Sequence, residues 1–342
     1  MGILPVRSTF LASLLWLQAS PVTLSPVITL PTDGTVVGSI ADLDMVPNGN
    51  VLVLDGQAHQ ILEFDQSGAL VRTISRDGQG PGEIRGAIEL EVTKTGEIWV
   101  VDFGNSRIAR WDPNGNHLGS RLLGEVIGQP VGLPQELVII ESGVYLKSAG
   151  FMPNQPVRVF RLQEDLQGVA DTLAVLVPAP GAPICQACPI SVSPSGRVYG
   201  PRGDTIFAVS EVGPSGEQVL VLRRDGVPAV LRSDAELARL RSAVGRLPIP
   251  ERVKISEPEF SPYKLRFGRL AIGFDGHGRT WLAPTVPEEE PTVFYLFDSG
   301  GRYLTSVRAE AHLTGFKVRG RHLLAIGETP IGEPIVRVYE IQ

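Results

Sequence analysis

A repeat of 47 residues constrains this chain more than any other feature of its sequence. The segment MVPNGNVLVLDGQAHQILEFDQSGALVRTIS, which starts at Met45, aligns with VTKTGEIWVVDFGNSRIARWDPNGNHLGSRLL, which starts 47 residues later. In this alignment Gly49 matches Gly96 and Asp55 matches Asp102. A repeat period of about 20–50 residues indicates a solenoid, a propeller or another array of small units.

Each repeat unit has the pattern of a four-stranded antiparallel sheet. Apolar residues alternate with other residues at Val51 and Val53, and again at Ile98 and Val100. This alternation is typical of strands with one buried face, and the glycine-containing segments between the strands predict hairpin turns. The sequence therefore predicts one meander of four strands in each unit.

The same glycine turn, followed by a short β-rich run, occurs six times. The glycines are Gly49, Gly96, Gly143, Gly196, Gly278 and Gly320, with spacings of 47, 47, 53, 82 and 42 residues. The longest spacing contains an insertion, 227–267, between the fourth and fifth units. Units of this length with four strands are typical of propeller blades. We predict an all-β, six-bladed β-propeller of four-stranded antiparallel blades, with a five-bladed or eccentric ring as the alternative.

The two ends of the chain are predicted to complete one blade together. The C-terminal segment PIVRVYEIQ reads as the third strand of the sixth blade, which leaves its outermost strand missing. The segment PVITLP, Pro26 to Pro31, can supply that strand and so remove an open sheet edge. We therefore expect a single propeller domain over 26–342.

Charge and the N-terminal pattern restrict the partners and the location of the protein. The formal net charge of −6 and the pI near 5.5 provide no basic field for nucleic acid. Arg7, the apolar run from Phe10 to Leu17 and the small residue Ala19 have the layout of a signal peptide, and the run is too short to span a bilayer. We expect a signal peptide over 1–19, a secreted or periplasmic protein, and no transmembrane segment.

The second unit resembles the NHL-type repeat. Its sequence GEIWVVDFGNSRIARWDPNGN carries the V-x-D, N-x-R-I and aromatic-Asp elements at Val101-Asp102, Asn105, Arg107-Ile108 and Trp111-Asp112. The loop GQGPGE, 78–83, resembles the interblade loop of bacterial exported six-bladed propellers of this NHL-repeat-like group. The first unit departs from the motif at Ala58-His59-Gln60. The resemblance implies the propeller fold, and it implies binding proteins, scaffolds and a few lyases as functions.

Propeller connectivity separates the loops into two faces. Connections between strands two and three of a blade, and between successive blades, emerge on the same face, which we call the loop-rich face. The irregular segments assigned to it are 55–60, 75–87, 102–107, 147–157, 178–190, 200–204, 227–267, 283–292 and 327–334. The opposite face, the tight-turn face, carries short turns such as DQSG, DPNG and DSGG. Because binding residues collect on loops held by a rigid scaffold, we expect the site on the loop-rich face.

The candidate binding residues form a polar rim around the central channel on this face. They are Asp55, His59, Arg76, Arg85, Asp102, Asn105, Arg107, Lys147, Arg202 and Asp204. We predict a non-catalytic, monomeric propeller that binds a protein, a peptide or a glycan, with no catalytic residues, cofactor or metal. The alternative is a lyase or lactonase that uses a divalent cation, Ca²⁺ or Zn²⁺, at the channel mouth. Against that alternative, Asp55 and Asp102 stand at strand ends, where carboxylates commonly bond the backbone of their own loops.

Three further features of the sequence lead to local predictions. Cys185 and Cys188 are the two cysteines, and in an oxidising compartment they can form a small disulfide ring. Ser233 and Glu236 have the spacing of a capping box at the start of one short amphipathic helix. This helix is either a lid over the channel or a packing element at the rim of blades 4 and 5. Glu83 is expected to bond neighbouring backbone within a tight interblade turn.

Overall fold

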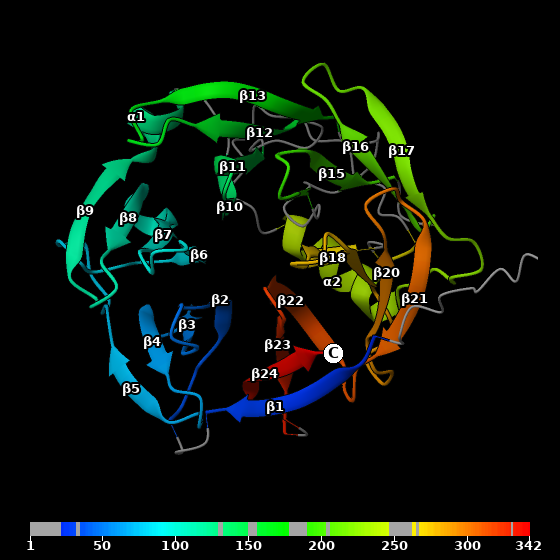
Figure 1. Ribbon diagram of the computed structural model, residues 1–342, viewed down its shortest axis with the longest axis horizontal. Coiled ribbons are helices and arrows are strands. Elements are labelled where there is room, and N and C mark those ends of the chain that lie inside the picture. Colours follow the sequence, from blue (N-terminus) through cyan, green and yellow to red (C-terminus); the bar gives the residue numbers. More distant parts are fainter. Residues whose placement is uncertain are drawn as a thin grey trace, which may run out of the picture.

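The computed structural model is a ring of six four-stranded antiparallel sheets (Figure 1). The structure describes residues 22–31, 35–128, 133–149, 156–177, 190–202, 206–245, 262–264, 267–329 and 331–342. The predicted all-β, six-bladed propeller is confirmed. The proposed signal peptide, 1–19, and both cysteines lie outside the described residues.

The blades follow one another along the chain, and each is numbered from its innermost strand outward. Blade 1 contains β2 (Ile40–Met45), β3 (Val51–Asp55), β4 (Gln60–Phe64) and β5 (Leu70–Thr73). Blade 2 contains β6 (Ala87–Val92), β7 (Ile98–Asp102), β8 (Arg107–Trp111) and β9 (His117–Leu122). Blade 3 contains β10 (Leu133–Ile140), β11 (Gly143–Ala149), β12 (Val157–Leu162) and β13 (Val169–Leu176).

Blades 4 to 6 complete the ring. Blade 4 contains β14 (Ser191–Val192), β15 (Val198–Pro201), β16 (Ala208–Val212) and β17 (Gln218–Arg223). Blade 5 contains β18 (Phe267–Phe274), β19 (Thr280–Pro284), β20 (Val293–Phe297) and β21 (Tyr303–Arg308). Blade 6 contains β22 (Leu313–Arg319), β23 (His322–Glu328), β24 (Pro334–Ile341) and, as its outermost strand, β1 (Leu24–Leu30).

The ring closes as the sequence predicted. The N-terminal strand β1 pairs antiparallel with β24, with Leu24 opposite Ile341 and Leu30 opposite Val336. The strand begins two residues before the predicted segment and ends one residue before Pro31. Because strands from both ends of the chain share blade 6, the edge of β24 is paired rather than open to other chains.

The tight turns owe their shape to aspartate and glycine. In the turn between β4 and β5, Asp65 Oδ1 accepts hydrogen bonds from the backbone N–H groups of Ser67 (2.8 Å) and Ala69 (3.1 Å). Gly68 has a φ of 84°, a left-handed conformation that costs little without a Cβ atom. A hydrogen bond from the Ser67 hydroxyl, together with these backbone bonds, lowers the pKa of Asp65, so its carboxylate stays ionised in the turn.

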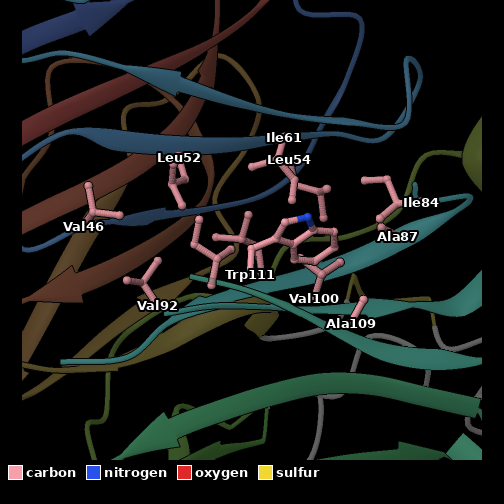
Figure 2. Close-up of a cluster of buried hydrophobic side chains, with 12 residues drawn as sticks. Val46, Leu52, Leu54, Ile61, Ile84, Ala87, Val92, Val100, Ala109 and Trp111 are labelled. Atoms are coloured by element: carbon pink, nitrogen blue, oxygen red, sulfur yellow. The ribbon is translucent and has the colours of Figure 1, made fainter. Parts of the chain in front are cut away.

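Buried side chains form one hydrophobic cluster between each pair of neighbouring blades in the described part of the chain. Figure 2 shows the cluster between blades 1 and 2, where Leu52, Leu54 and Ile61 face Val100 and Trp111. Trp111 is 1 % exposed. Fully burying a side chain of this size contributes roughly 1.5–3 kcal/mol or more, so packing between blades is the main source of stability.

The insertion contains the predicted helix, α2 (Asp234–Gly245). Its capping box is confirmed, because Ser233 N–H donates to Glu236 Oε2 (2.7 Å) and Glu236 N–H donates to Ser233 Oγ (3.2 Å). Lys264 ties the helix start to blade 5 by ion pairs with Glu236 (2.9 Å) and Glu288 (3.6 Å). In Figure 1, α2 projects onto the inner strands of blade 5.

The sequence did not predict a second short helix, α1 (Leu123–Ile127), in the connection from blade 2 to blade 3. Leu123, Val126 and Ile127 are buried in the cluster between these blades. Its five residues are too few for a periodic pattern to be recognised. Among the described residues, neither helix has the length and apolarity required to cross a membrane.

Candidate functional site

A network of buried charges lies on the innermost strands of blades 1, 2 and 6. Its carboxylates are Asp42 and Asp44 on β2 and Glu91 on β6, and its cations are Lys317 and Arg319 on β22. The three carboxylates are at most 3 % exposed. We call these five residues the channel network, because innermost strands surround the axis of the ring.

Lys317 joins three blades. Its Nζ donates to Asp42 Oδ2, to Glu91 Oε1 and to the carbonyl oxygen of Leu90, each at 2.8 Å. The nearby carboxylates outweigh burial and raise the pKa of Lys317. Lys317 therefore stays charged at neutral pH.

Arg319 forms a second connection across the same blades. Its Nε and Nη2 donate to the two carboxylate oxygens of Asp44, at 2.6 and 2.9 Å, and Nη2 also donates to Glu91 Oε2 at 2.8 Å. Bidentate pairs of this kind are strong and fix geometry. Burial raises the pKa of Glu91, although Arg319 and Lys317 oppose that shift.

Blade 3 adds one more buried ion pair. Lys147 Nζ lies 3.0 Å from Glu136 Oε2, and the two residues are direct partners in the pairing of β10 with β11. The sequence placed Lys147 on the polar rim around the channel, in a loop; in the structure it lies inside β11 and is 3 % exposed. The strand continues past the predicted start of the loop, so Lys147 pairs within its sheet.

Asp55, a predicted rim residue, instead organises the loops at the start of blade 1. It is 1 % exposed. Its Oδ1 accepts hydrogen bonds from the N–H groups of Gln57 (2.9 Å) and Ala58 (3.0 Å), and its Oδ2 accepts one from Gly38 (2.9 Å). Asp55, predicted on the polar rim around the channel, is therefore a buried support of these loops. The expectation that Asp55 bonds its own loop is confirmed.

Three more predicted rim residues, Asp102, Asn105 and Arg107, hold the loop that joins blades 1 and 2. This loop, residues 74–86, is called the blade 1–2 loop. Asp102 is fully buried and accepts hydrogen bonds from Arg85 N–H (2.9 Å), Asn105 Nδ2 (2.7 Å) and Arg107 Nε (3.0 Å). The Arg107 guanidinium also donates to the Glu83 carbonyl oxygen at 2.6 Å. Asp102 and Arg107 are thus buried supports of this loop rather than exposed contacts.

The remaining contacts of the blade 1–2 loop are local. Asn105 Nδ2 donates to the carbonyl oxygen of Gly78 (2.9 Å), and Gly86 N–H donates to His59 Nδ1 (3.3 Å). Glu83 Oε2 accepts a hydrogen bond from Gly80 N–H (2.8 Å), which confirms the role expected for Glu83. This bond and the neighbouring Arg76 lower the pKa of Glu83.

Three predicted rim residues are exposed as expected. Arg76 and Arg85 lie on the blade 1–2 loop and pair with Glu83 (3.0 Å) and Asp77 (3.4 Å). Arg202 is exposed directly after β15 in blade 4, away from that loop. Asp204 lies outside the described residues. The structure therefore does not gather the predicted rim residues into a single site.

A pocket of about 230 Å³ opens on the loop-rich face between blades 5 and 6. We call it the blade 5–6 pocket. Its lining includes the apolar Leu270, Ala271, Ala283, Val286, Phe294, Leu313 and Phe316 and the polar Lys264, Thr285, Glu288, Thr292, His312 and Thr314. Apolar walls with a few polar groups are typical of ligand sites. The sequence missed these residues individually, although loops 227–267 and 283–292 were assigned to the correct face.

Leu270 gives this pocket an unusual backbone. It has a φ of 56°, a left-handed conformation that is an outlier for a bulky residue, and it lies where the pairing of β18 with β19 shifts register between Phe267 and Ile272. β-Bulges and strained residues concentrate beside functional sites because they redirect side chains. The Leu270 side chain is directed into the wall of the pocket.

Polar groups at the pocket mouth are held in fixed positions. Lys264 lies between Glu236 and Glu288, and its hydrogen bond lowers the pKa of Glu236 to about 2. His312 Nδ1 lies 3.2 Å from the carbonyl oxygen of Glu290. Within the described ranges, no group of three or more His, Cys, Asp or Glu side chains has an arrangement that could hold a metal ion.

Comparisons with known proteins agree with this fold. The model of a family described as 6-bladed beta-propeller, DUF5128, matches residues 24–123. A comparison with curated proteins finds no matching sequence. The solved structures that are similar over nearly the whole chain include the three that follow, and at their sequence identities the similarity concerns the fold alone.

The first of these structures is a protein of Bacteroides fragilis named as a candidate exported protein, with 13% identity, 94% of this chain and 95% of that chain covered, and a TM-score of 0.57. The second is a member of the DUF4221 family from Bacteroides vulgatus, with 11% identity, 94% and 98% covered, and a TM-score of 0.58. The third is a catalytically inactive virginiamycin B lyase from Staphylococcus aureus with quinupristin, with 13% identity, 93% and 99% covered, and a TM-score of 0.50.

Proposed function

We propose that this protein is a non-catalytic, exported propeller of the NHL-repeat-like group that binds a peptide segment of a partner protein in the blade 5–6 pocket. The observation that carries the proposal is the pocket itself, which has an apolar floor and polar mouth on the loop-rich face. Such a surface suits a peptide that places one apolar side chain in the pocket and its polar backbone at the mouth.

The rigid surroundings of the pocket support this function. Phe294 and Phe316 are buried in the cluster between blades 5 and 6, with ring centroids 5.0 Å apart, so the floor is preformed. The Lys264 ion pairs hold the start of α2 against the pocket mouth. A preformed site loses little conformational entropy on binding, which favours affinity.

The carboxylates that would serve an enzyme are engaged in structural contacts. Asp55 and Asp102 accept backbone hydrogen bonds in their loops, and Asp42, Asp44 and Glu91 neutralise Lys317 and Arg319. Buried carboxylates held in this way support scaffold roles in preference to general acid–base catalysis. The names of similar structures, one a candidate exported protein and one a lyase, leave both functions to be tested.

A pocket-filling substitution tests the proposal. Peptides selected from a random displayed library against the purified chain should bind with a shared apolar residue, and Thr314→Trp should weaken that binding about ten-fold or more. Thr314 is exposed on β22 at the pocket. Ser306→Trp, on the exposed part of β21, is the matched control and should bind as the unmodified protein does. Selected peptides that bind Thr314→Trp with unchanged affinity would refute the pocket as the site.

The cation-dependent lyase or lactonase is tested in parallel by metal content. Elemental analysis, together with melting temperature in chelator and in added Ca²⁺ or Zn²⁺, should give no stoichiometric metal and no shift if the protein is a binding module. Stoichiometric metal with a chelator-sensitive melting temperature would favour the enzyme and direct substitutions to Asp55, His59 and Asp102.

A further inference from the structure

We infer that the tight-turn face carries a second site, a groove between blades 4 and 5 that binds a neutral saccharide. The groove has a volume of about 320 Å³. This volume lies within the range of about 300–1,000 Å³ that small-molecule sites occupy. We call it the blade 4–5 groove, and it lies on the face opposite to the blade 5–6 pocket.

Aromatic side chains from both blades form a wall of the groove. Tyr199 on β15 and Phe274 on β18 are both half-buried, and their ring centroids lie 5.5 Å apart with the planes tilted by 55°. Both rings belong to the edge of the hydrophobic cluster between blades 4 and 5, which fixes their orientation. A partly exposed aromatic face offers an apolar surface with a polar edge, and the C–H face of a sugar ring is complementary to it.

Hydroxyl groups surround this aromatic wall. They are those of Ser193, Ser195, Tyr199, Thr280 and Ser299. Ser193 Oγ and Ser195 Oγ lie 3.0 Å apart, so this side of the groove already presents a linked pair of donors and acceptors. Burial raises the pKa of Tyr199, which keeps its hydroxyl neutral and able to donate. Hydroxyls that both donate and accept match the hydroxyls of a saccharide.

The two charged residues of the lining have opposite signs. Arg197 is exposed, with its Nη1 3.4 Å from Glu211 Oε2, and Asp298 accepts hydrogen bonds from Gly300 N–H (3.0 Å) and Arg302 N–H (2.9 Å). Because the lining carries no excess charge, it favours a neutral ligand over an acidic or basic one. Asp298 Oδ2 also pairs with Arg302 Nε (3.0 Å), so each charge of the lining has a counter-charge beside it and a ligand meets no strong net field.

The backbone beside the groove argues against an added peptide strand. The outermost strand of blade 4, β17, has an edge that is not paired within its sheet, which is where a peptide would add. A Cβ atom at Gly301 would lie 2.1 Å from the carbonyl oxygen of Val221, so the turn at Gly301 is packed directly on that strand. This contact leaves the aromatic and hydroxyl side chains as the accessible surface of the groove.

A titration with neutral sugars tests the inference. The probes are glucose, galactose, N-acetylglucosamine and maltose, followed by saturation-transfer NMR and calorimetry on the purified chain. At least one should bind saturably, and Ser299→Trp, which fills the groove from its exposed turn, should weaken binding about ten-fold or more. Gln66→Trp changes the equivalent position in the exposed outer turn of blade 1 and is the matched control. It should bind within about two-fold of the unmodified chain.

Two results would overturn the saccharide inference, and a third would reassign the groove. No saturable binding of any probe would overturn the inference, and so would sugar binding that Ser299→Trp leaves unchanged. Displayed peptides that bind the chain and lose affinity in Ser299→Trp, without sugar binding, would assign the groove to a peptide instead. Thr314→Trp should leave sugar binding intact, which separates this site from the blade 5–6 pocket.

Discussion

Replacing Lys317 with methionine tests whether the channel network stabilises the ring. The substitution keeps the length of the side chain and removes a cation that lies 2.8 Å from both Asp42 and Glu91. Both carboxylates are buried, at 0 % and 3 % exposure, so they would remain in a poorly solvated position with only Arg319 nearby. Breaking a buried ion pair by removing one partner costs about 3–5 kcal/mol.

This loss can be converted into a melting temperature. An unfolding entropy of about 2.1 cal/mol/K per residue gives about 0.7 kcal/mol/K for a domain of this length. Lys317→Met should therefore lower the melting temperature by about 4–7 °C if the ring unfolds cooperatively. The assay is differential scanning calorimetry, with coincident circular dichroism to check cooperativity.

The deficit of Lys317→Met should also depend on pH. Burial raises the pKa of Glu91 above its ordinary value, so the folded protein binds this proton more tightly than the unfolded chain does. In Lys317→Met, Glu91 keeps Arg319 as its one cation, and the cost of its buried charge is present at neutral pH and is relieved as the pH falls through that raised pKa. The difference in melting temperature between variant and unmodified protein should therefore shrink on acidification.

A surface lysine provides the control. Lys94 pairs with Glu141 at 3.1 Å, but their side chains are 77% and 83% exposed. Because exposed pairs contribute about 0–1 kcal/mol, Lys94→Met should shift the melting temperature by less than about 1.5 °C. If Lys317→Met behaves like Lys94→Met, the network does not stabilise the ring and the reasoning is refuted.

Three other predictions concern the loops and the helix. Asp102→Ala should speed hydrogen exchange and proteolysis in the blade 1–2 loop because Arg107 loses its carboxylate, whereas Asp102→Asn should have a smaller effect; equal exchange in both variants and the unmodified protein would contradict this. Glu236 should titrate at about pH 2 by carboxyl NMR, and Lys264→Met should move that midpoint toward 4.5; the contact is thus present above about pH 4.5 and lost as the pH falls toward 2. Burial lowers the pKa of His117 below 6.5, so stability should decline as the pH falls from 6.5 through that pKa, and His117→Phe should abolish this part of the decline in a pH series of melting temperatures.

The repeat predicted the fold because propeller blades are local structures. Each blade is a meander of strands that follow one another in sequence, so turn glycines and alternating apolar residues carry most of the information. The glycine turn at Gly320 identified blade 6 although its sequence differs from the first two repeats. The pairing of β1 with β24 was also predictable, because the last blade lacked one strand.

The sequence contained a signal for the acidic half of the channel network. Asp42 and Asp44 are each 47 residues before an acidic residue, Glu89 and Glu91, and Glu136 follows Glu89 by the same interval. Extending the repeat alignment upstream by one strand predicts these positions. Their cationic partners were not predictable in this way, because Lys317 is 275 residues from Asp42 and lies in a blade with a shorter turn.

The burial of Asp55 and Asp102 within the predicted rim has a physical reason. Asp55 and Asp102 follow buried strands directly and precede loops with unpaired backbone N–H groups, so the nearest donors are those of their own and adjacent loops. Buried backbone donors require acceptors, and a carboxylate at the strand end supplies them. A polar residue in such a position therefore indicates loop structure before it indicates a ligand.

The distribution of charge and space around the axis explains why the proposed sites both involve blade 5. The channel network fills the side formed by blades 1, 2 and 6, where Lys317 and Arg319 cross-link three innermost strands. A cavity of about 100 Å³ beside the axis is lined by Glu91, Lys317 and Arg319 of this network, and it also shares Leu270 and Phe316 with the blade 5–6 pocket. The same cavity shares Pro194 and Phe274 with the blade 4–5 groove.

Blade 5 therefore separates two concave surfaces on opposite faces by only a few side chains. Phe274 is near the end of β18 at the tight-turn face, and Leu270 is on the same strand toward the loop-rich face. A displacement of β18 would change the walls of both sites at once, whereas the ion pairs on the far side of the axis resist such a displacement in blades 1, 2 and 6. If a ligand at one site displaced β18, thermodynamic linkage would require that the resulting effect on affinity be reciprocal between the two sites.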